Sequence, residues 1–327
     1  MLSARRTVTA VLAGVTTGAA QRASSRLPGS VTEALARTNH RGEAVTLAEG
    51  PAVALGATLA AVTGSALAGA PRTAVAAAVA GLGAAAVGTY DDVVGARPDQ
   101  KRDKGFAGHL RALQEGRVSA GAVKIAGVGV SALLAGQALS GRSSGFGRAI
   151  DTTLSAIVIA GAANVVNLFD LRPGRALKVG LMAAGPLVAG PDRDGSAAVA
   201  AAVTGAAVAA LPDDLGERSM LGDAGANALG ALLGVGLAAR LGRPGKALVA
   251  AGLIGLMAAS ERVSFTKVIA RTPALNAVDL WGRRPPSREP AVEAPATPVA
   301  EVTAAPNAGD VTGAGDAGEP GAGAGGR

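Results

Sequence analysis

The 327-residue sequence contains no cysteine and only two histidines, His40 and His109. Without cysteine, the chain can form no disulfide, no thiolate nucleophile and no thiolate metal site. Two histidines are too few for a zinc site built on several imidazoles, so any metal would need carboxylate ligands of the kind that suit Mg²⁺. The absence of a GK[ST] pattern excludes a P-loop. Two histidines in separate loops give no basis for a Ser-His-Asp triad.

Charged residues are also scarce, at 17% of the chain, whereas hydrophobic residues make up 49% and the mean hydropathy is +0.35. This balance is too apolar for an ordinary soluble domain and indicates a membrane protein. The 48 glycines predict helices that pack backbone to backbone through small side chains. The net charge of +7 is scattered through short loops, which argues against nucleic acid and favours anionic lipids and phosphates as partners.

Nine apolar runs predict an all-α polytopic helix bundle. A bilayer requires about 20 residues per helix, and several runs are shorter, so we expect about nine transmembrane helices within a range of eight to ten. The alternative is that one or two runs are buried or re-entrant helices. A signal peptide is the alternative for the first run, but no small-x-small cleavage site stands cleanly after it. The runs cover residues 7–20, 51–70, 73–89, 119–138, 150–167, 176–190, 195–211, 226–239 and 245–259.

The loops between these runs differ in charge on the two faces of the membrane. One face holds twenty Lys and Arg residues up to Arg288 and the other holds nine, so the positive-inside rule makes the first face cytoplasmic in the cell membrane. The carboxylates are divided fifteen to three in the same direction. This excess indicates either chemistry on the cytoplasmic face or longer, better solvated loops. The cytoplasmic segments are 22–50, 90–118, 168–178, 213–225 and everything after 260.

The last 39 residues differ from the rest of the chain. Residues 289–327 are rich in Pro, Ala and Gly, contain six acids and one base, and show no apolar periodicity. We therefore expect a membrane domain over residues 1–288 and a disordered cytoplasmic tail over residues 289–327.

The first polar motif, GTYDDVVG, places Asp91 and Asp92 at the end of the third apolar run. Adjacent carboxylates at a helix end indicate a metal, a proton relay or a solvated helix terminus. Basic residues follow closely and could dock a lipid phosphate or a nucleotide diphosphate. These are Lys101, Arg102, Lys104 and Arg111.

The second motif, NVVNLFDLRPGRALK, places Asn164, Asn167 and Asp170 on one face at the end of the fifth run. Asparagines in an apolar helix can hold neighbouring helices together by hydrogen bonds. A carboxylate followed by Arg172 and Arg175 at a helix mouth points instead to anion and metal handling.

The third motif, MLGDAGANALG, places Asp223 between glycines at the start of another helix, where backbone can approach a ligand closely. The alternative is that Asp223 only caps that helix. Lys124 lies about five residues, or roughly 7 Å, inside the fourth run. It can pair with a lipid headgroup phosphate, or simply extend to the membrane surface.

In order and in membrane side, YDD, NVVNLFD and GDAGA resemble the motifs of the polyprenyl-phosphate N-acetylhexosamine-1-phosphate transferases. That family includes the phospho-MurNAc-pentapeptide transferase and the lipid-linked GlcNAc-phosphate transferases. The segment RTNHRGEAVTLAEGPA, at 37–52, also looks like the family's first cytoplasmic loop. The resemblance spans roughly residues 37–270.

The resemblance implies Mg²⁺-dependent transfer of a sugar 1-phosphate from a UDP-sugar to polyprenyl phosphate, with release of UMP. Asp223, with Asp92, would bind the metal. Asp91 and Asp92 would bind or deprotonate the lipid phosphate, and Asp170 would face the nucleotide sugar. The substrate-binding residues would be Asn39, His40, Arg41, Lys104, His109, Lys124, Asn164, Asn167, Arg172 and Arg175.

The sequence also departs from the family. A second acid usually follows the second motif, where this chain has Leu171 and Arg172, and the last loop lacks the family's histidines. Met220 stands where the phospho-MurNAc-pentapeptide transferase has an aromatic residue that stacks on uracil. These departures favour, as the alternative, an impaired relative that binds polyprenyl phosphate as a scaffold or regulator. A transporter fits less well, because nearly all ionisable residues lie at helix ends.

Overall fold

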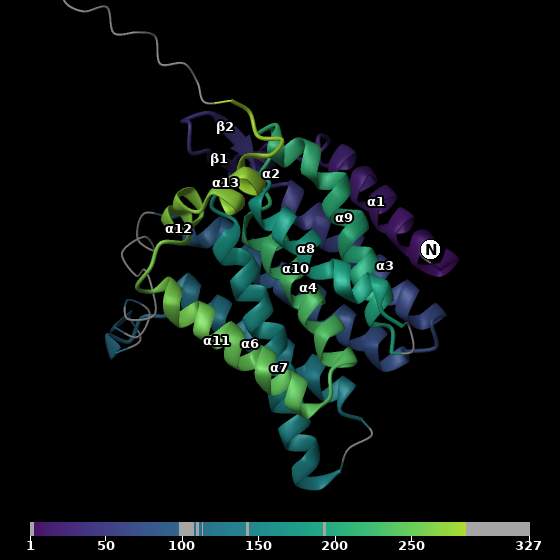
Figure 1. Ribbon diagram of the computed structural model, residues 1–327. Helices are drawn as coiled ribbons and strands as arrows, with labels where there is room; N and C mark the ends of the chain where they lie inside the picture. The colour runs from purple at the N-terminus through teal and green to yellow at the C-terminus, as the bar shows by residue number, and fades with distance from the viewer. Residues whose placement is uncertain are drawn as a thin grey trace, which may run out of the picture. The chain divides into compact units, whose positions relative to one another are not determined.

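The computed structural model describes residues 3–97, 108, 111–112, 114–141, 144–191 and 194–285. Within these residues the fold is all-α, with twelve α-helices, one π-helical turn and one small hairpin (Figure 1). The helices are α1 (Ala4–Ser24), α2 (Gly29–Ala34), α3 (Glu49–Leu67), α4 (Pro71–Tyr90), α6 (Ala120–Leu139), α7 (Gly145–Phe169), α8 (Arg175–Ala189), α9 (Ser196–Leu215), α10 (Gly222–Arg240), α11 (Arg243–Ser260), α12 (Phe265–Arg271) and α13 (Pro273–Leu280). The π-helical turn is η1 (Asp91–Gly95), and the strands are β1 (Ala36–Thr38) and β2 (Ala44–Thr46).

Each of the nine apolar runs forms a helix. Among the described residues, five segments are long and apolar enough to cross a membrane: α3, α4 with η1, α6, α7 and α9. A sixth is possible if α11 and α12, which meet at a bend of 94°, count as one broken span. The structure thus supports a multi-pass membrane protein with five or six candidate spans and does not show nine. Helix α8, for example, has only 15 residues.

Small side chains fill the core, as the glycine and alanine content predicted. Helix α10 lies at the centre and packs against α3, α4, α7 and α9 (Figure 1). At Gly230 the backbones of α10 and α7 are so close that a Cβ atom would lie 2.4 Å from the carbonyl oxygen of Ala162. Only glycine fits there, because a Cβ atom could not come so near a carbonyl oxygen.

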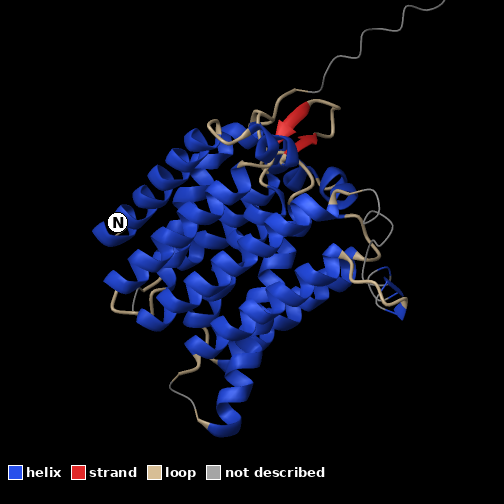
Figure 2. Ribbon diagram, turned by 180° about the vertical axis from the view of Figure 1, so that it is seen from behind, coloured by secondary structure: helices blue, strands red, loops and turns tan. Residues whose placement is uncertain are grey.

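One end of the bundle carries the non-helical structure. The antiparallel β1–β2 hairpin lies there with α2, α12 and α13 (Figures 1 and 2). This hairpin was not predicted from the sequence. The N–H of Met220 donates to the carbonyl oxygen of Thr46 over 2.9 Å, which joins β2 to the segment that leads into α10.

The chain divides into two units, Met1–Arg284 and Pro285–Arg327. The first unit contains every helix and strand named above. The tail expected over residues 289–327 lies outside the described residues.

Candidate functional site

The N-terminus of α10 is where the three acidic motifs meet. Gly222 has a φ of 61°, a left-handed conformation that favours glycine, and it turns the chain into the helix. The N–H groups of Asp223 and Ala224 each donate over 3.0 Å to one carboxylate oxygen of Asp92. The backbone amide of Gly222 also lowers the pKa of Asp170, although burial raises that pKa overall. Two successive amides thus bind the carboxylate of Asp92, as expected at a helix N-terminus, which attracts anions.

Gly88 allows the first motif to lie very close to the start of α10. A Cβ atom on Gly88 of α4 would lie 2.4 Å from the carbonyl oxygen of Asp223. Beyond it the α-helix changes to the π-helical turn η1, which carries Asp91 and Asp92. Such π-helical turns are rare in proteins, and those that do occur are frequently found at functional sites.

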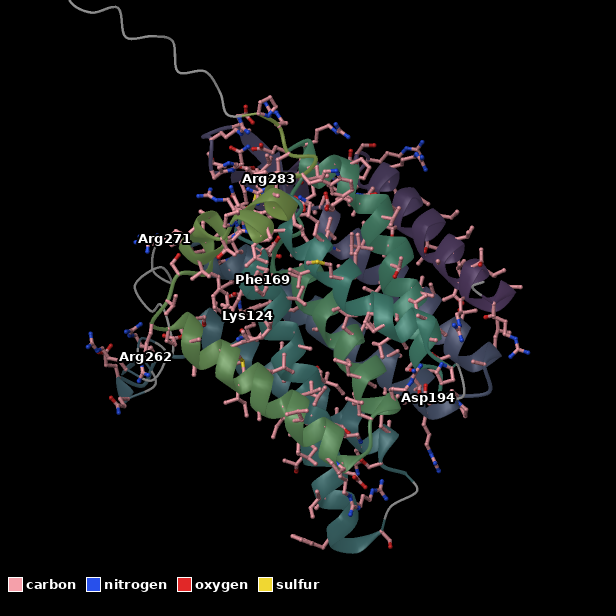
Figure 3. All side chains as sticks on the ribbon, viewed as in Figure 1. Lys124, Phe169, Asp194, Arg262, Arg271 and Arg283 are labelled. Carbon is pink, nitrogen blue, oxygen red and sulfur yellow. The ribbon has the colours of Figure 1, made fainter. Side chains whose placement is uncertain are left out.

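Lys124 joins the remaining two carboxylates. Its ammonium nitrogen lies 2.7 Å from an oxygen of Asp91 and 2.7 Å from an oxygen of Asp223. Figure 3 marks the position of Lys124 among the side chains of the bundle. All three side chains are largely buried, with exposed fractions of 15–23%. Lys124 therefore bridges two acids and offsets one of their two charges, instead of only extending to the membrane surface.

The capping alternative for Asp223 is wrong. Leu221 is the N-cap residue of α10, and it makes no side-chain cap hydrogen bond. The cap is supplied across the bundle by Asp92, which leaves the carboxylate of Asp223 directed to Lys124.

A small pocket opens beside these acids. Asp170 lies in its wall, and its pKa is raised well above the ordinary value by burial and by the negative charges of Asp214, Asp223 and Asp92. The guanidinium of Arg172 also faces the pocket and makes no ion pair within the described part of the chain. The pocket is lined by Asn39, His40, Asp170, Leu171, Arg172, Pro173, Asp214, Glu217, Ser219 and Met220.

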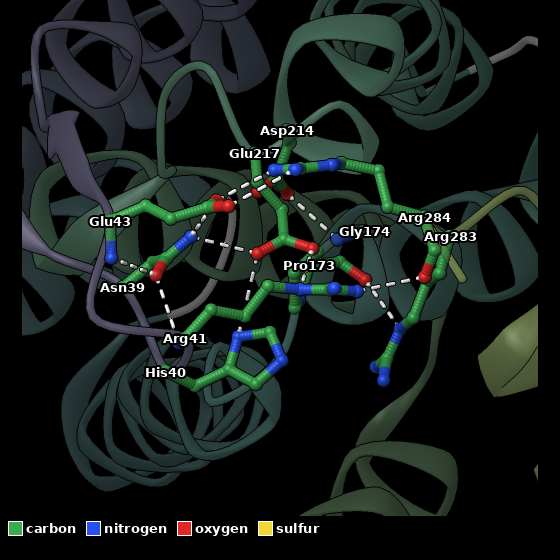
Figure 4. A network of polar contacts seen from close by, with 10 residues as sticks. All are labelled: Asn39, His40, Arg41, Glu43, Pro173, Gly174, Asp214, Glu217, Arg283 and Arg284. Atoms are coloured by element: carbon green, nitrogen blue, oxygen red, sulfur yellow. Dashed lines mark hydrogen bonds and ion pairs between the residues drawn. The ribbon is translucent and has the colours of Figure 1, made fainter. Parts of the chain in front are cut away.

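The loop of the β-hairpin forms one side of this pocket (Figure 4). Asn39 is buried, and its amide donates to Glu217 over 2.8 Å and to Glu43 over 3.0 Å. Arg41 forms an ion pair of 2.8 Å with the same Glu217. Glu217 has a φ of 54°, an uncommon conformation for a residue other than glycine. The loop of the hairpin is thus bound to Glu217, whose backbone conformation is strained. Nothing in the sequence indicated this residue.

His40 lies 3.7 Å from Glu217 at the edge of the pocket. Burial lowers the pKa of His40 below its ordinary value, against the opposing charge of Glu217. A neutral imidazole at pH 7 can donate and accept a hydrogen bond, which suits a polar ligand better than a fixed cation would.

Arg175 was expected to bind substrate, but in the structure its side chain contacts other parts of the protein. It is only 4% exposed and forms a two-point ion pair with Asp279 of α13, at 2.8 and 3.0 Å. Its third contact, at 2.9 Å, is the hydroxyl of Thr266 on α12. With its donors used in this way, Arg175 fastens the C-terminal helices to the start of α8.

The C-terminal segment continues over the pocket edge (Figure 4). Arg283 donates to the carbonyl oxygen of Pro173 over 3.0 Å and forms an ion pair with Asp279 over 2.7 Å. Arg284 then makes two hydrogen bonds to Glu43 on the hairpin, of 2.6 and 3.1 Å. The segment therefore connects the first loop to the second motif.

The remaining expected residues fall into two groups. Asn164 and Asn167 lie near the end of α7, and neither side chain forms a hydrogen bond within the described part of the chain. Lys104 and His109 lie outside the described residues, as do Lys101 and Arg102.

The carboxylates are suitable ligands for Mg²⁺, but they are not arranged to coordinate the ion. Oxygen ligands suit that ion. Among the described residues, however, no three acids or histidines are arranged to hold a metal. Asp91 and Asp223 are instead bridged by the ammonium of Lys124. A metal on Asp223 would require that ammonium to move.

Two further acids are close to the site and were missed. Glu49, at the start of α3, is 2% exposed; the Ser219 hydroxyl donates to one carboxylate oxygen, and the other has no hydrogen bond within the described residues. Asp214 is 3% exposed and accepts the N–H of Gly174 over 3.0 Å. Local sequence gave no signal for them, because their burial results from contacts between distant segments.

The sequence matches no model of a known protein family, and a search of characterised proteins also finds no match.

Proposed function

We propose that the protein is an integral-membrane transferase that moves a sugar 1-phosphate from a UDP-sugar to polyprenyl phosphate and releases UMP. One observation carries the proposal. Three motifs that are far apart in sequence meet at the N-terminus of α10. There Asp92 accepts hydrogen bonds from two backbone amides, Lys124 bridges Asp91 and Asp223, and the charges of Asp92 and Asp223 raise the pKa of Asp170. The family that the motifs resemble uses the same motifs for this reaction.

The arrangement suits the handling of phosphates. Joining a phosphomonoester to a diphosphate brings several negative charges together, so cations and amide donors must be fixed nearby. Lys124 and the α10 amides are such groups, and Arg172 faces the adjoining pocket without an ion pair within the described residues. We propose that the lipid phosphate approaches Lys124, and that the nucleotide sugar lies over the mouth of the pocket, close to Asp170, Asn39 and His40. The pocket itself, of about 30 Å³, would admit only a small part of that ligand.

Mg²⁺ belongs to the proposal as a bound cofactor. When bound, it would neutralise charge on the diphosphate. Asp223 and Asp92 would hold it once the ammonium of Lys124 leaves Asp223 for the incoming phosphate. The chain's own residues would bind and orient the two substrates.

The number of membrane spans and the orientation of the bundle are also proposed. We propose about nine spans, within a range of eight to ten, in the cell membrane, with the α10 N-terminus, the hairpin and the C-terminal segment on the cytoplasmic face. The charge difference between the two sets of loops supports this orientation. A cytoplasmic site would have direct access to UDP-sugars.

The decisive experiment uses the purified full chain in detergent with polyprenyl phosphate, Mg²⁺ and a panel of UDP-sugars, and it measures UMP release. We expect Asp223→Asn to lower the rate by about 100-fold, the usual effect of removing one charge-stabilising group. Asp151→Asn is the matched control, because Asp151 is paired with Arg243 at the opposite end of α7. No UMP release with any donor would refute the transferase proposal.

A second candidate is a non-catalytic relative that binds polyprenyl phosphate as a scaffold or regulator. The Lys124 bridge favours it, because an ammonium already occupies the position between Asp91 and Asp223 and offsets one of their two charges without a metal. Binding of polyprenyl phosphate that depends on Lys124, without any UMP release, would identify this role.

A further inference from the structure

The wall formed by α1 and α9 carries an open groove of about 580 Å³, which shares no lining residue with the pocket beside Asp170. The two helices touch at Gly205, where a Cβ atom would lie 1.9 Å from the carbonyl oxygen of Ala10. At Gly14 a Cβ atom would still be 3.3 Å from the carbonyl oxygen of Gly205. One turn later, at Gly18, no atom of α9 lies within 4 Å of that position. The helices therefore separate toward the C-terminal end of α1 and leave the groove between them.

The walls of the groove are small and apolar. Gly18, Ala19 and Ala209 line it. Val15 on α1 lines its edge and is 63% exposed, and Val208 on α9 is 56% exposed. Because α9 is a candidate membrane span, these side chains face hydrocarbon when the protein lies in a bilayer. A flexible hydrocarbon chain fits such a surface.

The end of the groove is polar and carries positive charge. The amide nitrogen of Gln21 is buried there and has no hydrogen-bond partner within the described residues. The guanidinium of Arg22 turns back to within 3.6 Å of the Cβ position of Gly18 and forms no ion pair with any residue that the structure describes. Asp213 also lines the groove, but its carboxylate is already paired with Arg218 at 2.9 Å. Two donors at this end are therefore available to an anion.

We propose that this groove binds an anionic glycerophospholipid, with one acyl chain along the α1–α9 wall and the phosphate at Arg22 and the amide of Gln21. The buried, unsatisfied donor beside a cation gives the phosphate a fixed position. The separation of the helices provides the space for the chain. This site is independent of the proposed transferase reaction.

The test uses the purified full chain in phosphatidylcholine nanodiscs, with phosphatidylglycerol titrated and bound lipid counted by native mass spectrometry. We expect Arg22→Gln to weaken phosphatidylglycerol binding about fivefold, from roughly 1 kcal/mol per basic residue at an anionic surface. Gly18→Leu fills the groove and should abolish the bound lipid. Leucine is a better helix former than glycine, so this variant should fold, which circular dichroism would check.

Arg5→Gln is the matched control, since Arg5 is an exposed arginine at the other end of α1. Equal losses in Arg5→Gln and Arg22→Gln would overturn the proposal, because they would indicate only a diffuse surface charge. Unchanged binding in folded Gly18→Leu would also overturn it. So would displacement of phosphatidylglycerol by a lower concentration of polyprenyl phosphate, which would assign the groove to the isoprenoid.

Discussion

Lys124 is the residue on which the charge balance of the site depends. It is the cation that contacts Asp91 and Asp223, and all three groups are mostly buried. We expect Lys124→Met to lower the free energy of unfolding by roughly 3 kcal/mol, because two facing carboxylates would lose their counter-charge. Thermal unfolding in detergent measures this change. Lys267→Met on the exposed face of α12 is the control and should change stability by less than about 0.5 kcal/mol.

The same variant distinguishes a hidden metal site from a purely structural ion pair. If Asp223 and Asp92 can hold Mg²⁺ once the ammonium no longer contacts Asp223, Mg²⁺ should raise the melting temperature of Lys124→Met more than that of the parent protein. We expect this larger shift. Equal shifts in the two proteins would argue against a metal on Asp223.

Asp279 makes the docking of the C-terminal segment sensitive to acid. Burial alone would raise its pKa, but the hydrogen bond from Arg175 and the charge of Arg283 lower it below the ordinary value. Its stabilising effect is therefore complete above the unfolded pKa of about 4 and is lost as the pH falls through the lower folded value.

Hydrogen exchange of residues 273–280 should accordingly stay slow down to about pH 4 and rise below it. Asp279→Asn should show fast exchange already at pH 7, since a buried Arg175 without its carboxylate destabilises the docking by roughly 3–5 kcal/mol. An unchanged exchange rate in that variant would show that Arg175 does not hold the segment.

At the scale of elements, helix packing depends on a few close backbone contacts. Gly230→Ala should destabilise the protein by about 1–3 kcal/mol, because a Cβ atom there would meet the backbone of α7 at 2.4 Å. Gly252→Ala on α11 has open space around it and should be neutral or slightly stabilising. Equal melting temperatures of the two variants would contradict this account of the core.

The nine long helices could be predicted from the sequence, because each one is marked by a local run of apolar residues. All nine apolar runs are helices, and Asp91, Asp92, Asp170 and Asp223 lie at helix ends as expected. The hairpin and the docked C-terminal helices were not predicted. Their stability comes from pairs such as Arg175 with Asp279, which are 104 residues apart and leave no periodic pattern. For the same reason the roles of Lys124 and Arg175 could not be separated from sequence.

For the molecule as a whole, the orientation of the bundle in the membrane is directly testable. The natural sequence has no cysteine, so single cysteines can be introduced without removing others. With the proposed topology, a membrane-impermeant maleimide should label Ser144→Cys in intact cells, and it should label Ser30→Cys only after the membrane is opened. Both positions are exposed in the structure. The reverse pattern would invert the proposed orientation.

The carboxylate of Asp92 on the amides of Asp223 and Ala224 also determines which anions can compete for that position. Asp92 is a tethered internal ligand, present at an effective concentration far above that of any solute. A singly charged anion would offer the amides little that a carboxylate does not already provide. An external ligand must therefore gain additional contacts, such as those of a multiply charged phosphate with Lys124 or Arg172. We therefore expect small monoanions to bind weakly at the α10 N-terminus, because an internal carboxylate competes with them for the same amides.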